Sequence, residues 1–194
     1  VKMKNLQVNR FEKVESVSKL EDGLFLVKTD KAEYVTTYVV VATGYYDQPN
    51  YMNIPGENLD KVYHYFKEAH PFFDTDVLVI GGKNSAVDVA LELQKAGARV
   101  TVSYRGSHYS PSVKPWILPE FEALVRTGEI EMLFNSQVNE IRETEVVLTV
   151  DGHERVIKND FVFAMTGYHP DHQFIRAMGV GIDNETGRPT YDPE

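Results

Sequence analysis

The chain has 194 residues, a formal charge of −9, 42% hydrophobic residues and no cysteine. The negative charge argues against a surface for nucleic acid or anionic membrane, and no apolar run approaches the length of a bilayer span. Without cysteine the chain can form no disulfide, no thiolate metal site and no Cys-x-x-Cys pair. The composition favours a small molecule as partner. The chain begins at Val1 without a signal-like segment, which fits a cytoplasmic protein or a piece of one.

The first forty residues are typical of short strands separated by polar turns. Apolar runs at 24–27 and 34–36 follow turn residues, which predicts an antiparallel meander. The apolar run 38–44 then predicts a buried strand that closes in small residues. Proline and glycine gather over residues 48–56 and indicate a linker.

The next segment combines an apolar run, two glycines and a helical pattern. Residues 77–80 are all aliphatic, which fits a strand buried on both faces. We expect a helix to begin near Ser85, because Ser85 and Asp88 resemble a capping box, and to end before Gly97. Such a junction presents free backbone N–H groups to an anion. It therefore predicts a phosphate-binding turn, although strand, glycines and helix also meet for packing reasons alone.

Aligned to the pattern G-x-G-x-x-G/A, Gly81 and Ala86 take the first and third places. Lys83 takes the second place, where glycine normally lets a pyrophosphate approach the backbone. With lysine in this place, the pattern no longer predicts that a pyrophosphate can approach the backbone closely.

The strand predicted over residues 99–104 ends without the acidic residue that holds the ribose hydroxyls of NAD. Arg105 stands at this end instead, and its planar guanidinium suits a 2′-phosphate, which favours NADPH over NADH. The alternative is a solvated loop cation. Lys114 can add charge to the same phosphate or can be an ordinary exposed lysine. The pattern then predicts a helix at 119–127, a strand at 130–134, a hairpin turning at 151–152 and an apolar strand at 161–167.

Both apolar runs end in Thr-Gly-Tyr and flank the glycine turn. In this order the chain resembles the two-dinucleotide-binding flavoprotein reductases, the pyridine nucleotide-disulfide oxidoreductases. Gly81 to Ala86, the turn at 104–107 and the segment 109–116 look most like the bacillithiol disulfide reductase branch, which is similar to thioredoxin reductase but lacks its Cys-x-x-Cys. The resemblance implies an α/β fold. Residues 1–50 would be part of an FAD domain with the β-meander, 51–167 a Rossmann-like NADPH domain with a parallel sheet, and 168–194 a return segment to the FAD domain.

The resemblance also implies an internal fragment. The glycine turn for FAD and any catalytic cysteine would precede Val1, and a Gly-Asp motif would follow Glu194. The implied reaction passes hydride from NADPH to FAD and on to a disulfide such as bacillithiol disulfide, in a protein that is a homo-oligomer when whole. A flavin-dependent monooxygenase and a non-catalytic NADPH-binding redox sensor are the alternatives.

For the cofactor site, the resemblance implies that residues 81–86 hold the pyrophosphate, that Arg105 holds the 2′-phosphate and that Gly167 lets the nicotinamide approach. We nominate no side chain as acid, base or nucleophile, because the cofactor carries the hydride. His169 and His172 are expected to have a loop role and no metal. The expected cofactor-binding residues are Gly81, Gly82, Lys83, Asn84, Ser85, Ala86, Ser103, Arg105, Lys114, Gly44 and Gly167.

Overall fold

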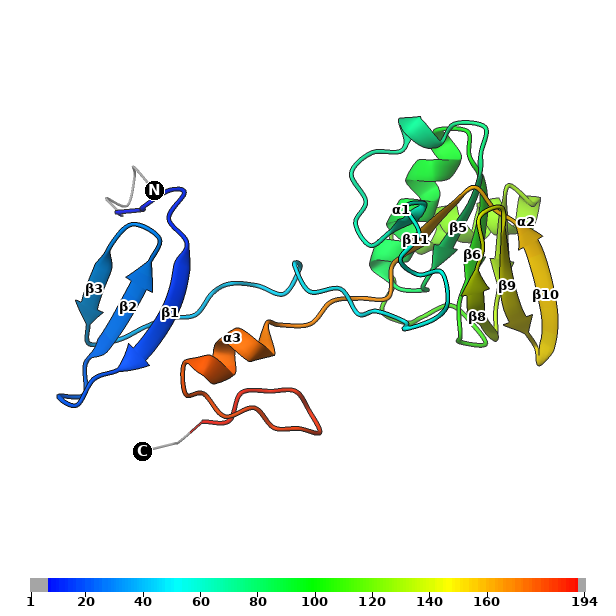
Figure 1. Cartoon of the computed structure of the whole chain (residues 1–194). Coiled ribbons are helices and arrows are strands. Elements are labelled where there is room, and N and C mark those ends of the chain that lie inside the picture. Colours follow the sequence, from blue (N-terminus) through cyan, green and yellow to red (C-terminus); the bar gives the residue numbers. More distant parts are fainter. Residues whose placement is uncertain (1–6, 192–194) are drawn as a thin grey trace. The chain divides into compact units, whose positions relative to one another are not determined.

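The computed structural model describes residues 7–191, which fall into two compact units. One unit comprises Val1–Gln48 with Tyr168–Glu194, and the other comprises Pro49–Gly167. The second unit is thus inserted into the first, as the sequence colours in Figure 1 show. Within residues 7–191, no helix combines the length and the apolar character needed to cross a membrane.

A five-stranded sheet forms the centre of the unit Pro49–Gly167, and its strand order is β4-β11-β5-β6-β7. Every neighbouring pair in it is parallel. The predicted α/β class with a parallel sheet is therefore confirmed. The strands are β4 (Val62–Tyr63), β5 (Asp76–Ile80), β6 (Arg99–Ser103), β7 (Ile130–Leu133) and β11 (Phe161–Ala164).

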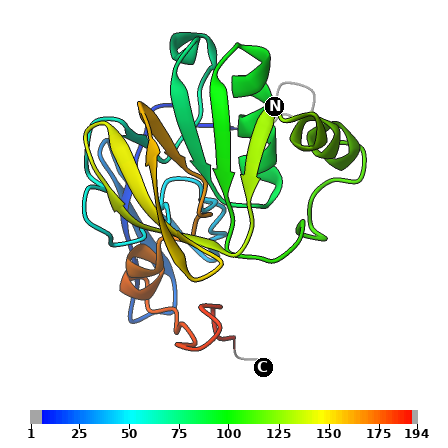
Figure 2. The same ribbon diagram turned by 90° about the vertical axis from the view of Figure 1, so that its right-hand side faces the viewer.

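Both faces of the parallel sheet are covered. Alternate residues of β5 point to opposite sides, so Val77 and Val79 join one core cluster while Leu78 and Ile80 join another. The first cluster includes residues of helix α1 (Asn84–Lys95), of helix α2 (Leu118–Thr127) and of the short 3-10 helix η2 (His70–Phe72). The second includes residues of the antiparallel sheet β8-β9-β10, which lies across the parallel sheet from α1 in Figures 1 and 2.

The antiparallel sheet of this unit consists of β8 (Ser136–Ile141), β9 (Glu145–Val150) and β10 (His153–Lys158). Strands β9 and β10 form the expected hairpin, with Val150 paired to His153. Its turn residues Asp151 and Gly152 have φ angles of 48° and 82°, which an Asp-Gly pair adopts readily. The helix expected at 119–127 and the strand expected at 130–134 are also confirmed, to within one residue at each end.

The other unit contains the predicted meander. Its strands β1 (Val14–Lys19), β2 (Phe25–Thr29) and β3 (Glu33–Thr36) pair in sequence order and antiparallel. After the inserted unit, the chain adds helix α3 (His172–Ala177), whose N-cap residue Asp171 accepts a hydrogen bond from the Phe174 N–H at 2.9 Å.

The strand expected over residues 38–44 is absent, so this prediction is wrong. The segment is assigned to no strand or helix, and Tyr38 and Val40 are 82% and 87% exposed. A strand needs a neighbour for its backbone hydrogen bonds, and none of the strands within residues 7–191 pairs with this segment. The similar run 161–167 becomes β11 up to Ala164 because it lies between β4 and β5.

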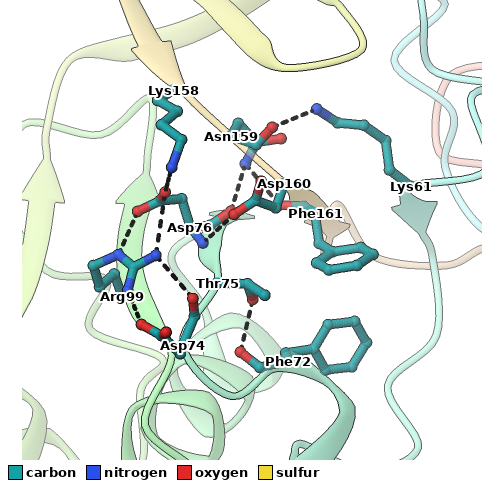
Figure 3. A network of polar contacts seen from close by, with 10 residues as sticks. All are labelled: Lys61, Phe72, Asp74, Thr75, Asp76, Arg99, Lys158, Asn159, Asp160 and Phe161. Carbon is teal, nitrogen blue, oxygen red and sulfur yellow. Dashed lines mark hydrogen bonds and ion pairs between the residues drawn. The ribbon is translucent and has the colours of Figure 1, made fainter.

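A polar network joins the strands of the parallel sheet at their N-terminal ends (Figure 3). Arg99 at the start of β6 and Lys158 at the end of β10 both donate to the carboxylate of Asp76 at the start of β5, each at 2.7 Å. Asp160 accepts from the Asp76 N–H at 2.8 Å. This network lies at the edge opposite the glycine turn, because β5 runs from Asp76 to Ile80.

Candidate functional site

Gly81 packs against the end of a neighbouring strand. Its φ is +138°, and a Cβ atom built on it would lie 2.6 Å from the Met165 carbonyl oxygen and 3.1 Å from Cβ of Ala86. Its N–H donates to the Ser103 carbonyl at 2.9 Å. Glycine is therefore required here by backbone shape and by the close approach of β11 and α1.

Gly82 has a different neighbour, the ring of Tyr104. A Cβ atom at Gly82 would lie 2.3 Å from Tyr104 Cγ, and one at Gly106 would lie 2.4 Å from Tyr104 Cε1. The ring therefore lies against both glycines and joins the turn after β5 to the turn after β6. Sequence reasoning missed Tyr104. The available signal was an aromatic residue that lies next to the predicted 2′-phosphate residue and two positions before a glycine.

Helix α1 begins one residue earlier than expected, at Asn84, with Lys83 as its N-cap. No side chain caps it by a hydrogen bond, so the predicted capping box of Ser85 and Asp88 is wrong. Asp88 instead forms an ion pair with Lys114 at 3.2 Å. An uncapped first turn leaves its backbone N–H groups open to an anion.

The lysine at the second fingerprint place causes no backbone strain. Lys83 has φ −107° and ψ −172°, an extended conformation that any residue adopts. Its side chain is exposed, as is that of Ser85, whereas Ala86 is 1% exposed and packs in the core. A cationic side chain therefore stands at the positive end of the helix, where it adds to the attraction for phosphate.

Arg105 lies on the turn that follows β6, next to Tyr104. Ser103, the last residue of β6, pairs with Ile80 at the end of β5, so this turn adjoins the glycine turn. The Arg105 side chain is exposed, and it forms no hydrogen bond or ion pair with any residue of the range 7–191. Its guanidinium is therefore free to bind an added anion.

Ser103 has a different environment from Arg105. It is 2% exposed, and its hydroxyl lies 2.8 Å from the hydroxyl of Ser136 at the start of β8. The Ser136 hydroxyl also donates to the Leu133 carbonyl at 2.7 Å. The Ser103 side chain is thus part of the contact between β6 and β8, while its carbonyl oxygen supports Gly81.

Asn84 and Lys114 meet at the start of α1. The Asn84 side-chain amide donates to the Ser112 carbonyl at 2.9 Å and accepts from the Lys114 N–H at 2.8 Å. The Lys114 ammonium lies against Asp88, one turn further along α1. Lys114 is therefore beside the glycine turn but is already paired with a carboxylate.

The two Thr-Gly glycines lie in different units. Gly167 follows β11, has φ +93°, and its carbonyl accepts from the Asn50 N–H at 3.0 Å. Thr166 donates to the Asn50 carbonyl at 2.6 Å. Gly44 belongs to the other unit, where it has φ +71°, and a Cβ atom built on it would meet no atom within 4 Å.

The ring centroids of His169 and His172 lie 5.8 Å apart. The loop position expected for both is wrong for His172, which is the first residue of α3. Residues 7–191 contain no group of three His, Cys, Asp or Glu residues placed to hold a metal ion.

The strand order places the glycine turn at a change of direction in the sheet. From β5 the chain continues to β6 and β7 on one side, and β11 returns on the other side of β5. In open α/β sheets, ligands bind at such a point, beyond the C-terminal ends of the strands. This strand order, an uncapped helix start and an arginine without a partner among residues 7–191 are together typical of dinucleotide-binding α/β proteins.

Comparison with known proteins agrees with this class. The family model described as pyridine nucleotide-disulphide oxidoreductase matches residues 1–194, and the chain belongs to this family. The chain is 63% identical to bacilliredoxin reductase Bdr of Bacillus subtilis, covering 100% of the chain and 60% of that protein.

Solved structures give the same result. The bacillithiol disulfide reductase Bdr of Bacillus cereus is 64% identical with a TM-score of 0.93, covering 98% of this chain and 60% of that one. The thioredoxin reductase of T. acidophilum is 26% identical with a TM-score of 0.78, covering 94% and 60%. The chain thus spans about 60% of the length of these relatives.

Proposed function

We propose that the unit Pro49–Gly167 binds NADPH at the edge formed by the glycine turn, the start of α1 and the turn at Arg105. The observation that carries this proposal is the exposed Arg105 guanidinium, which has no partner within residues 7–191 and lies beside an uncapped helix N-terminus. A 2′-phosphate has two negative oxygens for the guanidinium fork, and the helix start offers N–H groups to the pyrophosphate.

The predicted residues have distinct roles in this proposal. Gly81, Gly82 and Ala86 shape the turn, and the N–H groups of Asn84 and Ser85 hold the pyrophosphate. Lys83 contacts a phosphate oxygen from the exposed side of the turn. Ser103 supports Gly81 through its carbonyl, and Lys114 lies on the neighbouring loop with its charge offset by Asp88. Gly167 leaves room at the end of β11 for the nicotinamide half, which carries the hydride when bound.

We further propose that this chain is part of an NADPH- and FAD-dependent reductase of a disulfide such as bacillithiol disulfide. The names of its Bacillus relatives, which describe reductases of bacilliredoxin and of bacillithiol disulfide, support this acceptor class. The unit that contains Gly44 and the meander would then belong to the FAD domain. The whole protein would be a cytoplasmic homo-oligomer. The side chains of the 194-residue chain would bind and orient the nucleotide, and none of them would act as acid, base or nucleophile.

A comparison of NADPH with NADH tests the nucleotide site. We would titrate the chain with each by calorimetry and follow the fluorescence of its only tryptophan, Trp116. We expect NADPH to bind more tightly. Arg105→Ala should weaken NADPH by about 1.5–3 kcal/mol and leave NADH nearly unchanged, because it removes a charge-assisted bond to the phosphate.

Arg126→Ala is the matched control, since Arg126 is an exposed arginine in the last turn of α2, away from the glycine turn. Its removal should change neither affinity. Equal weakening of NADPH and NADH by Arg105→Ala would contradict the assigned role. In the whole protein, NADPH oxidation that depends on oxygen and not on a disulfide would favour a monooxygenase.

A further inference from the structure

The loop 110–116 is attached to the start of α1 by the side chain of Asn84. This side chain uses both ends of its amide: Nδ2 donates to the Ser112 carbonyl at 2.9 Å, and Oδ1 accepts from the Lys114 N–H at 2.8 Å. Both partners are backbone atoms of the loop. An amide that is engaged at both ends has its orientation fixed by the loop, and it fixes the loop in return.

Other contacts hold the same loop in a single shape. Val113, which lies between the two backbone partners of Asn84, is 4% exposed and belongs to the core cluster of α1. Ser110 is 5% exposed, and its hydroxyl lies 2.8 Å from that of Ser112. The Lys114–Asp88 ion pair at 3.2 Å adds a second attachment one helical turn away. The loop is therefore packed and hydrogen-bonded at the helix end where the pyrophosphate is proposed to bind.

The engagement of the amide has a chemical consequence. The Asn84 side chain has already used one donor and one acceptor site on the loop, so one N–H is left to donate to a phosphate oxygen. We propose that the Asn84 side chain is a positioning residue that holds the loop 110–116 as one wall of the nucleotide site. Its backbone N–H remains part of the helix start. This inference rests on the proposed NADPH site and specifies how that site is kept in shape.

The proposal predicts two effects of removing the Asn84 amide, a more mobile loop and weaker NADPH binding. Asn84→Ala removes both hydrogen bonds and leaves the backbone of α1 intact, because alanine is a good helix former. The loop then gains freedom even without nucleotide. NADPH binding should weaken about tenfold, since the free chain must order the loop when it binds.

Trp116 reports the loop directly. It lies two residues after Lys114, is the only tryptophan and is 76% exposed. We would measure its fluorescence anisotropy and its quenching by acrylamide in the nucleotide-free 194-residue chain, and NADPH affinity by calorimetry. Circular dichroism would check that the variant is folded. Gln94→Ala is the matched control, because Gln94 is an amide on the same helix whose side chain contacts Glu129 and not the loop.

We expect Asn84→Ala to lower the anisotropy, increase the quenching and weaken NADPH, and Gln94→Ala to change none of these. Weaker NADPH binding with an unchanged Trp116 signal would make Asn84 a direct ligand and overturn the proposal. A freer loop with unchanged affinity would show that the loop is no part of the site and would also overturn it. If the unmodified chain binds no NADPH, the proposed function fails first, and the Trp116 signal still shows whether Asn84 holds the loop.

If Asn84→Ala does not fold, Asn84→Asp serves instead. The aspartate keeps the acceptor for the Lys114 N–H and loses the donor to Ser112. It should loosen the loop partially, and an unchanged Trp116 signal in this variant would again overturn the proposal.

Discussion

Tyr104 shows how one side chain connects two turns of the candidate site. Its ring occupies the space beside Gly82 and Gly106, so close that a Cβ atom on either glycine would overlap with it. Its backbone is fixed as well, since its N–H donates to the Leu133 carbonyl at 2.9 Å. Arg105 follows directly, so the position of its turn depends on this packing.

Gly82→Ala should therefore disturb the turn at Arg105. The added methyl group would lie 2.3 Å from Tyr104 Cγ, and the ring must move. We expect a loss of about 1–3 kcal/mol in the free energy of unfolding, as for other overpacked sites, and weaker NADPH binding. Urea unfolding and calorimetry measure the two effects.

The double variant Gly82→Ala with Tyr104→Ala is the control for this mechanism. Removal of the ring leaves space for the new methyl group, so the two substitutions should destabilise by less than the sum of their separate effects. Additive losses would show that Gly82 is needed for a reason other than Tyr104.

At the residue scale, the sequence predicted the glycine turn and Arg105, but not the side chains that contact these two turns. The spacing from Gly81 to Ala86 and the missing acid after the strand are local signals. The roles of Tyr104 and Asn84 depend on which loop meets which turn, and a helix start alone does not contain that information. The same limit explains the capping box: Asp88 follows Ser85 at the right spacing, but Lys114 is its partner.

At the scale of elements, the N-terminal edge of the parallel sheet depends on Asp76. Hydrogen bonds from Arg99 and then from Lys158 lower the pKa of the Asp76 carboxyl below its usual value. Because the pKa is lower in the folded state, this carboxylate stabilises the fold above the pKa of the unfolded chain. That contribution is lost as the pH falls through the folded-state value.

Asp76→Asn should flatten the acid limb of the stability curve. An amide does not titrate, so the free energy of unfolding of the variant should fall less than that of the unmodified chain between about pH 5 and pH 3. At pH 7 the variant should be less stable by about 1 kcal/mol, because Arg99 and Lys158 are largely exposed partners. Urea titrations at several pH values test this. Parallel curves for the two chains would contradict it.

Lys61 joins the start of β4 to two turns, the one between β8 and β9 and the one between β10 and β11. Its ammonium is buried and donates to the carbonyls of Arg142, Glu143 and Asn159 at 2.8, 3.1 and 2.9 Å. Burial lowers the pKa of Lys61, and nearby Asp160 and Glu143 act in the opposite direction. The side chain thus donates to three carbonyls that lie in turns outside the strands.

Lys61→Met should destabilise the unit by about 2–3 kcal/mol, because these carbonyls lose their donor in a place that water reaches poorly. Denaturant unfolding measures the change. Lys67→Met is the control, since Lys67 is an exposed lysine in the same segment and should have little effect. Equal effects of the two substitutions would mean that Lys61 contributes only its charge.

At the scale of the whole molecule, the sequence predicted those elements that find their partners within the chain. Strands β5, β6 and β7, helix α2 and the hairpin are confirmed because each packs against a near neighbour in sequence. The run 38–44 is apolar, as β11 is, but it has no pairing strand within residues 7–191. Hydrophobicity alone therefore did not decide between a strand and an unpaired extended segment.

The two units differ strongly in their buried cores. Both hydrophobic clusters consist of residues of Pro49–Gly167. In the other unit, Val17 at 6% exposure is the one buried hydrophobic residue among the described residues. Since apolar burial is the main source of stability, the free energy of local opening should be much lower in the meander than in the parallel sheet.

Hydrogen exchange on the 194-residue chain tests this difference and the nucleotide site together. We expect slow exchange at amides of β5, β6 and β11 and fast exchange at amides of β1, β2 and β3. NADPH at about 100 times its dissociation constant should add about 2.7 kcal/mol of protection, because it binds only the folded state. Protection should rise throughout the parallel sheet and stay unchanged in the meander, since the two can open separately. A uniform rise over both units would show that they unfold together.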